Sequence, residues 1–387
     1  MNFKLTRPAW MEVNLDLLEH NVKQIQANIS PNTKILAIVK SDAYEMGAKP
    51  IVHKLKRLGI DDFGVATLSE ALSIRQCFSD INILVLGYTP NYLMEETIQN
   101  NISATVYSLD SAKEFNEYAK SLHQKAHIHL AIDTGMRRIG FIPSEESKRE
   151  ILSISSLSHI VIDGAFSHFA SSDHDDAFSE KQFQEFLHFT EDLKKAGVSI
   201  PLRHISNSHG ILKWRKYDLD MVRPGIILYG SYDGLTGYDY DLKFIGAIKA
   251  QIAHIKTIPP NETVSYGRNY TTVRDTKIVT LPLGYTDGFP RMLSGKLQVL
   301  INGVKCPQIG NICMDQMMVD ATGVDCQVGD EVVLIGRQKN NEILLSDLAS
   351  QTQDIDTSYL THFNKRLPIV YIEDNDYVLI EDKMKKI

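Results

Sequence analysis

The chain has 387 residues, of which 43% are hydrophobic and 23% charged, and a formal net charge of −7; these values are typical of a soluble globular protein with one large core or two moderate ones. The acidic balance argues against a nucleic acid or an acidic membrane surface as the main partner. No apolar run approaches the roughly 18 residues that cross a bilayer, and the first residues contain no signal-like apolar core.

The cysteine pattern indicates a reducing compartment. Cys77, Cys306, Cys313 and Cys326 lack the paired spacing of metal ligands. They are more consistent with free thiols than with a disulfide framework. We therefore expect a cytoplasmic protein without a metal site.

The first predicted elements are a strand in MEVNL, residues 11–15, and a helix that Asp16 could cap and that ends near Asn28. Short apolar strands then alternate with helical stretches. The expected strands are 35–39, 63–67, 83–86, 102–106, 128–132, 160–166, 202–206 and 220–222. The expected helices are 48–58, 69–77, 92–98, 110–121, 145–157, 178–195 and 208–214.

Eight strand–helix alternations predict an α/β chain that begins with a (β/α)8 barrel of the TIM type. An open, doubly wound sheet is the alternative fold. That fold normally carries a Gly-rich phosphate loop after its first strand, and the sequence shows none there.

The alternation stops near Gly230–Tyr240, in GSYDGLTGYDYD. We place a domain boundary there, with a barrel domain at 1–239 and a β-rich domain at 240–387. Asn302-Gly303 predicts a hairpin turn, because both residues tolerate positive φ. The charged tail EDKMKKI is expected to fray. The other expected elements are strands at 247–258, 277–283, 297–301, 317–319 and 332–335, and helices at 346–351 and 359–364.

Lys40 follows the buried strand at 35–39 directly. Residues at the C-terminal ends of barrel strands line the ligand crevice. Desolvation there disfavours the charged amine, so Lys40 is a candidate Schiff-base former. Position alone is weak evidence, since most lysines at strand ends are solvated.

Other polar residues follow predicted strands as well. Arg138, His168, Ser208 and Arg223 should therefore face the same crevice. Taken singly, each of them is more often a surface or core residue, and the same holds for Arg137, His204 and His209.

Eight stretches are spread over nearly the whole chain: AIVKSDAY, DTGMRRIGF, SHFASSD, HISNSHG, MVRPGIILYG, VSYGRNY, LPLGYTDGFPR and GNICMDQMMVD. Together, in this order and spacing, they resemble the alanine racemases. The resemblance implies a fold-type III enzyme with pyridoxal 5'-phosphate bound to the barrel. It also implies a homodimer in which the C-terminal β domain contributes to the partner's active site.

The same resemblance implies a role for each matched residue. Lys40 would carry the cofactor and act as one base, and Tyr266 of the VSYG motif would be the second catalytic residue. The cofactor would be held by Tyr44, His168, Asn207, Ser208, Arg223, Gly225 and Ile226, with Arg223 at the pyridine nitrogen. Arg138 and Met314 would bind the substrate, and Tyr285, Asp315 and Thr357 would line the entrance.

The expected reaction is the interconversion of L-alanine and D-alanine, which supplies D-alanine as a peptidoglycan precursor. Racemisation removes the Cα proton from one face and returns a proton to the other. Two bases on opposite faces, Lys40 and Tyr266, are the economical way to do both.

The sequence departs from the family pattern at three places. Glu45-Met46-Gly47 stands where the family usually has Gly-His-Gly. Ala131 stands where an often carbamylated lysine positions the arginine at 138; a bound chloride, another side chain or a looser arginine could substitute. Thr357 stands where a tyrosine usually faces the substrate channel, with Tyr359 two residues out of register.

Thr357 makes serine, or a broader range of small amino acids, an alternative substrate, because one added hydroxyl is only weakly rejected by an apolar pocket. Two proteins of other activity share the barrel. A pyridoxal-phosphate homeostasis protein usually ends after the barrel, whereas this chain continues beyond Tyr240. A fold-type III decarboxylase would be expected to carry a Gly-rich phosphate loop, which is not found.

Overall fold

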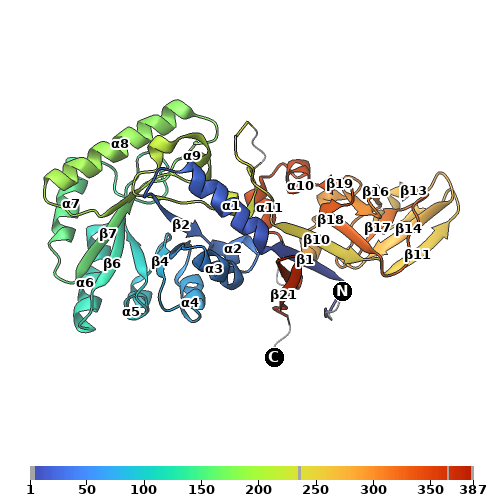
Figure 1. Cartoon of the computed structure of the whole chain (residues 1–387), viewed down its shortest axis with the longest axis horizontal. Coiled ribbons are helices and arrows are strands. Elements are labelled where there is room, and N and C mark those ends of the chain that lie inside the picture. Colours follow the sequence, from blue (N-terminus) through green and yellow to red (C-terminus); the bar gives the residue numbers. More distant parts are fainter. Residues whose placement is uncertain (1–4, 234–236, 364–365, 385–387) are drawn as a thin grey trace.

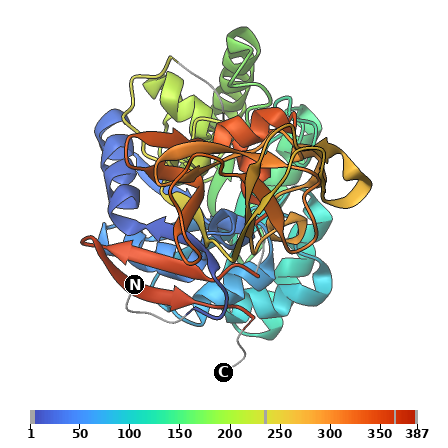
Figure 2. The same ribbon diagram turned by 90° about the vertical axis from the view of Figure 1, so that its right-hand side faces the viewer.

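The structure is a computed structural model that describes residues 5–233, 237–363 and 366–384. A helix-covered barrel and an elongated β-rich part lie end to end along the long axis of the molecule (Figure 1). Viewed from the β-rich end, the barrel helices lie around and behind that part (Figure 2). The predicted boundary at 239/240 lies close to residues 234–236, which are outside the described residues, and it stays a prediction.

The barrel is built from one parallel sheet in the order β8-β7-β6-β5-β4-β3-β2-β9. No ladder joins β8 to β9 in that order, but the Arg223 N–H donates to the Ser206 carbonyl across the seam at 2.9 Å. The nearly closed barrel confirms the predicted fold class. Its strands are β2 (Lys34–Ile38), β3 (Asp62–Val65), β4 (Asn82–Val85), β5 (Ser103–Val106), β6 (Ala126–Ala131), β7 (Ile160–Phe166), β8 (Leu202–His204) and β9 (Met221–Val222).

Several barrel helices begin at residues whose side chains accept the first free N–H groups. Ser108 and Asp175 act in this way, as their residue types predict. The first helix is capped by Asn14 rather than by Asp16, because the strand ends one residue earlier than expected. The helices are α1 (Leu15–Asn28), α3 (Ala48–Arg57), α4 (Leu68–Arg75), α5 (Met94–Gln99), α6 (Leu109–Ser121), α7 (Glu145–Ser155), α8 (Asp176–Lys195) and α9 (Ser208–Lys213), with short 3-10 turns η1 (Asn91–Leu93), η2 (Arg215–Tyr217) and η3 (Ile226–Tyr229).

The first strand, β1 (Ala9–Asn14), does not lie in the barrel to which the predicted division assigns it. It pairs antiparallel with β10 (Gly246–Gln251) and parallel with β20 (Ile369–Glu373). All its residues except Asn14 are buried, so the strand needs cover on both faces, which the centre of the β-rich sheet supplies. The chain therefore enters the barrel from the other part of the molecule.

The β-rich part contains an 11-stranded sheet in the order β11-β14-β17-β16-β15-β18-β10-β1-β20-β21, with β19 on β18, and a separate two-stranded sheet of β12 and β13. The single strand predicted at 247–258 is wrong, because the chain breaks after Gln251 and its two halves pair with different partners. The hairpin at Asn302-Gly303 is confirmed, with φ of 52° and 80°. The remaining strands are β11 (His254–Ile258), β12 (Thr263–Val264), β13 (Tyr270–Thr271), β14 (Thr276–Leu281), β15 (Gln298–Ile301), β16 (Val304–Ile309), β17 (Met317–Asp320), β18 (Glu331–Gln338), β19 (Asn341–Ile343) and β21 (Asp376–Glu381).

Two short helices close this part, α10 (Leu345–Gln351) and α11 (Asp356–Leu360), and η4 (Tyr266–Arg268), η5 (Tyr285–Asp287) and η6 (Arg291–Leu293) are 3-10 turns. The helix predicted at 359–364 begins earlier, and residue 364 is outside the described residues. In the described ranges, no helix is long and apolar enough to cross a membrane.

The expectation of a frayed tail is wrong up to Lys383. Glu381 belongs to β21, and the Lys383 ammonium pairs with the Asp42 carboxylate beside the barrel. Residues 385–387 are outside the described residues.

Candidate active site

Lys40 opens an unusual turn at the end of β2. The segment α2 (Lys40–Tyr44) continues into Glu45, and Ser41 to Glu45 all have positive φ, between 52° and 65°. None of them is glycine, and a left-handed conformation costs a non-glycine residue about 1–2 kcal/mol. Contacts from outside the turn must therefore hold it.

The carboxylate of Glu70 is the main such contact on the barrel side. Its Oε1 accepts the Ser41 N–H at 2.8 Å, and its Oε2 accepts the N–H groups of Ala66 (2.8 Å) and Thr67 (3.3 Å). Glu70 thus links the lysine turn to the start of α4. The Thr67-x-x-Glu70 spacing is a recognisable capping box, but the spacing gives no sign of the contact with Ser41.

Replacing Glu70 by Gln is expected to lower the free energy of unfolding by about 1–3 kcal/mol, because one charged acceptor of several N–H groups is lost. Chemical denaturation of the cofactor-free protein measures this change. The matched control is Glu114→Gln, at an exposed position of α6, which should change little. Equal effects of the two substitutions would contradict the proposed anchoring.

Basic groups converge around Lys40. Burial, and then the guanidinium of Arg138, lower the pKa of Lys40, while Glu70 opposes the shift. Burial, and then Arg223 and Arg138, lower the pKa of His168. Burial, and then Arg138, lower the pKa of Arg223. These groups lie close enough together to disfavour one another's charge. Such a cluster favours an anionic ligand, and it supplies an amine that is easily deprotonated.

A narrow cradle lies beside the lysine turn. The Ser208 hydroxyl accepts the Gly225 N–H at 3.0 Å, and the Tyr44 ring packs against Tyr229 at 4.8 Å between centroids. A Cβ atom at Gly225 would lie 2.6 Å from the Tyr44 hydroxyl, so glycine is required there. Ile226 begins η3, and the first N–H groups of a helical turn have no partner within the turn. The structure thus brings four predicted cofactor residues together.

Asn207, another residue predicted to hold the cofactor, has a structural role in the described chain. Its Oδ1 accepts the Gly210 N–H at 2.9 Å and caps α9, and Ser172 Oγ donates to the same oxygen at 3.0 Å. This side chain fixes the start of α9, where Ser208 stands. Its oxygen is occupied, and only its amide group is left for a ligand.

Arg223 is buried inside the barrel and is held there by four hydrogen bonds through its two terminal nitrogens. It donates to the carbonyl oxygens of Ser167 (2.7 Å) and Ile205 (3.0 Å), and to the Nδ1 atoms of His204 (3.0 Å) and His168 (3.1 Å). Each imidazole accepts from a guanidinium that does not deprotonate, so both rings are neutral and carry their proton on Nε2. His204 Nε2 then donates to His129 Nδ1 at 3.0 Å.

These buried histidines predict acid sensitivity. Burial lowers the pKa of His129 to about 4, and burial and Arg223 lower the pKa of His204 well below its usual value. Their folded-state pKa lies below the unfolded value of about 6.5, so the stability present above pH 6.5 is lost as the pH falls toward 4. For His129 the loss is about 3 kcal/mol.

Unfolding free energies measured in urea at pH 7 and pH 4.5 test this. His129→Gln should flatten the difference between the two pH values. The control His188→Gln removes a histidine whose side chain is 80% exposed and should leave the difference unchanged. An unchanged difference in His129→Gln would show that His129 is not the titrating group.

Arg138 stands at the mouth of the barrel without a partner. It makes no hydrogen bond or ion pair with any residue that the structure describes, whereas Arg137 lies 3.9 Å from Asp133. Ala131, Arg138 and His168 are among the residues that line a cavity of about 20 Å³. One water molecule needs about 10–15 Å³, so a small group can sit beside the arginine where alanine replaces the lysine of the family pattern.

A second group of predicted residues gathers on the β-rich part. Tyr266, Tyr285 and Met314 are 72%, 37% and 52% exposed, and the Asp315 side chain 55%. Their loops are joined, since the Tyr285 N–H donates to the Cys313 carbonyl at 3.0 Å. This second group of four predicted residues is therefore exposed on loops of the β-rich part.

The two groups do not meet in one chain. No hydrogen bond, ion pair or ring contact in the described ranges joins Tyr266 or Met314 to Lys40, Arg138 or Arg223. The strand β13, which follows the Tyr266 turn, lies at the far end of the β-rich part, away from α2 (Figure 1).

Thr357 belongs to neither group through its side chain. Its N–H and its Oγ1 donate to Asp233 Oδ1 and Oδ2 at 2.6 and 2.7 Å. The Thr357 hydroxyl already donates its hydrogen bond to Asp233, so it is not available to donate to a polar substrate. Tyr359 is fully buried and donates to the Gly288 carbonyl, so it does not replace the missing tyrosine at an entrance.

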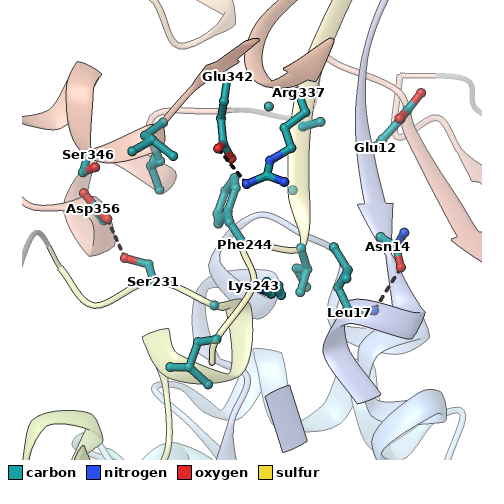
Figure 3. A pocket seen from close by; sticks show the side chains of 18 of the residues that line it. Glu12, Asn14, Leu17, Ser231, Lys243, Phe244, Arg337, Glu342, Ser346 and Asp356 are labelled. Carbon is teal, nitrogen blue, oxygen red and sulfur yellow. Dashed lines mark hydrogen bonds and ion pairs between the residues drawn. The ribbon is translucent and has the colours of Figure 1, made fainter. Parts of the chain in front are cut away.

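A cavity of about 710 Å³ lies elsewhere, between the start of β10 and the β18–β19 hairpin (Figure 3). Its polar groups are already paired: Arg337 with Glu342 at 2.9 Å, and Ser231 with Asp356 at 2.5 Å. The cavity contains none of the predicted site residues. Its size therefore does not make it the active site.

Sequence patterns did not indicate three residues that shape the site: Glu70, Asp233 and His129. Each of them acts through a partner that is distant in the chain. The Thr67-x-x-Glu70 signal identified a helix start, but nothing local indicates which backbone groups an acidic side chain will reach.

Two family models match the chain. They are described as the N-terminal domain of alanine racemase, over residues 13–233, and the C-terminal domain of alanine racemase, over residues 245–371. An alanine racemase of Clostridium novyi is 42% identical over 385 residues, covering 98% of this chain and 99% of its own length.

Solved structures are also similar. That of alanine racemase from Clostridium difficile 630 has a TM-score of 0.95 at 39% identity and covers 99% of this chain and 100% of its own. A histidine racemase from Leuconostoc mesenteroides has a TM-score of 0.88 at 28% identity, over 96% of this chain and 99% of its own. The likeness extends over both parts of the fold.

Proposed function

This chain belongs to the alanine racemase family, and from that premise we propose that it interconverts L-alanine and D-alanine with pyridoxal 5'-phosphate as cofactor. The observation that carries the proposal is the cluster at the barrel mouth, where a lysine of lowered pKa stands among Arg138, Arg223 and a narrow cradle. The free thiols of the described chain agree with the cytoplasmic location that we also propose.

The residues of the barrel mouth suit this cofactor. The cradle of Tyr44, Ser208, Gly225 and Ile226 would hold the phosphate, since it combines two hydroxyl groups with the backbone N–H at the start of η3. The lowered pKa of Lys40 provides the neutral amine that a Schiff base requires. Arg223, held by four hydrogen bonds, would donate to the ring nitrogen without losing its proton.

Bound there, the cofactor would draw electrons from Cα and make the Cα proton acidic. Lys40, held by its left-handed turn, would exchange that proton on one face of the substrate. Tyr266 would exchange it on the other face. Because Tyr266 is exposed, and because β13, which follows its turn, lies far from α2 in the same chain (Figure 1), we propose a homodimer in which each barrel receives Tyr266, Tyr285 and Met314 from the other copy.

Arg138 would bind the substrate carboxylate, since its charge acts on Lys40 and it has no hydrogen-bond or ion-pair partner in the described chain. Arg138→Gln is then expected to raise KM for alanine by about 10–100-fold with a smaller change in kcat, the effect of one charge-assisted hydrogen bond. Arg137→Gln, at the adjacent exposed position, is the control. Similar KM values for both variants would contradict this role.

Polarimetry combined with gas analysis tests the function. The purified, yellow protein should erase the optical rotation of L-alanine without releasing carbon dioxide. Rotation that persists, or carbon dioxide release, would refute the proposal. Measuring L-serine and L-histidine beside L-alanine addresses substrate choice, and we expect alanine to have the highest kcat/KM. A repeat with Thr357→Tyr tests whether that position affects the choice.

A further inference from the structure

Tyr266 receives no guidance from contacts of its own side chain. The ring is 72% exposed, and in the described residues the only hydrogen bond to Tyr266 reaches its backbone carbonyl. The direction in which the phenol projects therefore depends on the backbone that carries it. That backbone is unusual at the preceding residue.

Ser265 has φ of 70° and ψ of −177°. This region of backbone space is occupied almost exclusively by glycine, because a Cβ atom is crowded there. The turn continues with positive φ at Gly267 (75°) and Arg268 (53°). Such strain persists only where surrounding contacts fix the conformation.

Asn311 supplies those contacts. Its Nδ2 donates to the Tyr266 carbonyl at 2.6 Å, and its own carbonyl accepts the Ser265 hydroxyl proton at 2.6 Å. The two bonds close a ring between two loops that are 45 residues apart. Gly310 permits the approach, since a Cβ atom there would lie 2.7 Å from the Ser265 Cβ. The Tyr266 turn is thus fastened to the loop that also presents Met314.

We propose that Ser265 and Asn311 are positioning residues that aim Tyr266 out of its own chain and toward the substrate. The inference rests on the proposed function, because it requires Tyr266 to exchange a proton. Glycine at position 265 would relieve the strain, but it could not donate the hydrogen bond to Asn311. Serine at this position therefore tolerates the backbone strain, and its hydrogen bond to Asn311 fixes the direction in which the Tyr266 phenol projects.

Three variants separate the effect of the hydrogen bonds between the Ser265–Tyr266 turn and Asn311 from the effect of the backbone strain at Ser265. Ser265→Gly accepts the backbone conformation and lacks the bond, Ser265→Ala lacks the bond and keeps the crowded Cβ, and Asn311→Ala removes the bond to the Tyr266 carbonyl. The control is Asn341→Ala, which removes a comparable bond, from Nδ2 to the Gly303 carbonyl at 2.7 Å. The first three should lose about 10–100-fold in kcat with KM for alanine within about threefold, the effect of a misplaced catalytic group. The control should match the parent protein.

Proton exchange distinguishes positioning from general damage. In heavy water, the Cα proton of one alanine enantiomer should still exchange through Lys40 when Tyr266 is misplaced. Exchange of that enantiomer, followed by nuclear magnetic resonance, should then exceed its racemisation by about 10-fold or more in the three variants, whereas loss of folded protein lowers both rates equally.

The cofactor-free protein provides a second readout. Cys313 Sγ lies 3.6 Å from Ser265 Oγ, so loosening this contact should raise the rate at which iodoacetamide alkylates Cys313 in Ser265→Gly and Asn311→Ala, but not in Asn341→Ala. Parental kcat, exchange ratio and alkylation in all variants would overturn the inference. If the parent protein neither racemises alanine nor exchanges its Cα proton, the proposed function fails, and the alkylation rates alone decide whether Ser265 and Asn311 fix this loop.

Discussion

Replacing Lys40 by Ala is expected to abolish racemisation, with a loss of at least about 10⁴-fold, and to yield a folded protein that cannot attach the cofactor covalently. The side chain supplies both an amine for the Schiff base and one of the two proposed bases. The left-handed turn is held by the Ser41 N–H, which donates to the Glu70 carboxylate, and by the Asp42 carboxylate, which accepts the Ala48 N–H. Because neither bond uses the Lys40 side chain, removing it should leave the fold intact.

Absorbance after borohydride reduction measures covalent attachment, and polarimetry measures activity. Lys49→Ala is a suitable control, since Lys49 is an exposed lysine at the start of α3. It should bind cofactor and racemise alanine like the parent. Cofactor covalently bound in Lys40→Ala would show that another amine carries it.

Mixing two inactive variants is expected to restore activity. Tyr266→Phe should lower racemisation by about 10²–10⁴-fold, the contribution of one general base. If each site combines Lys40 of one copy with Tyr266 of the other, a mixed dimer of Lys40→Ala and Tyr266→Phe chains has one intact site and one doubly defective site. With random assortment in a symmetric dimer, an equal mixture should regain about one quarter of the parental activity.

The outcome separates two arrangements of the site. A site built within one chain would leave every mixed dimer with two defective sites, so no activity would return. Co-expression with different affinity tags isolates the mixed dimer, which should then show about half the parental activity. The control mixture pairs Lys40→Ala with Lys40→Ala and stays inactive.

Local sequence was enough to predict most of the helices and strands and the position of Lys40 after a buried strand. The apolar run at 35–39 lies in β2 as far as Ile38, with Lys40 two residues past the end of that strand, and Asn302-Gly303 forms its turn, because both features depend on neighbours in the chain. The likeness of short motifs to the alanine racemases pointed to the residues that converge at the barrel mouth. The alternation of strands and helices alone was enough to predict the barrel fold.

Only the tertiary structure decided which distant groups meet. It placed the strand at 9–14 in the β-rich sheet, and it held the turn after Lys40 in a left-handed conformation through Glu70. It also placed β13, next to the Tyr266 turn, at the end of the β-rich part that lies away from the barrel (Figure 1). Periodicity reports which face of an element is buried, but not which element covers it. That choice is made by packing and by hydrogen bonds between residues far apart in the chain, as between Asn311 and Tyr266.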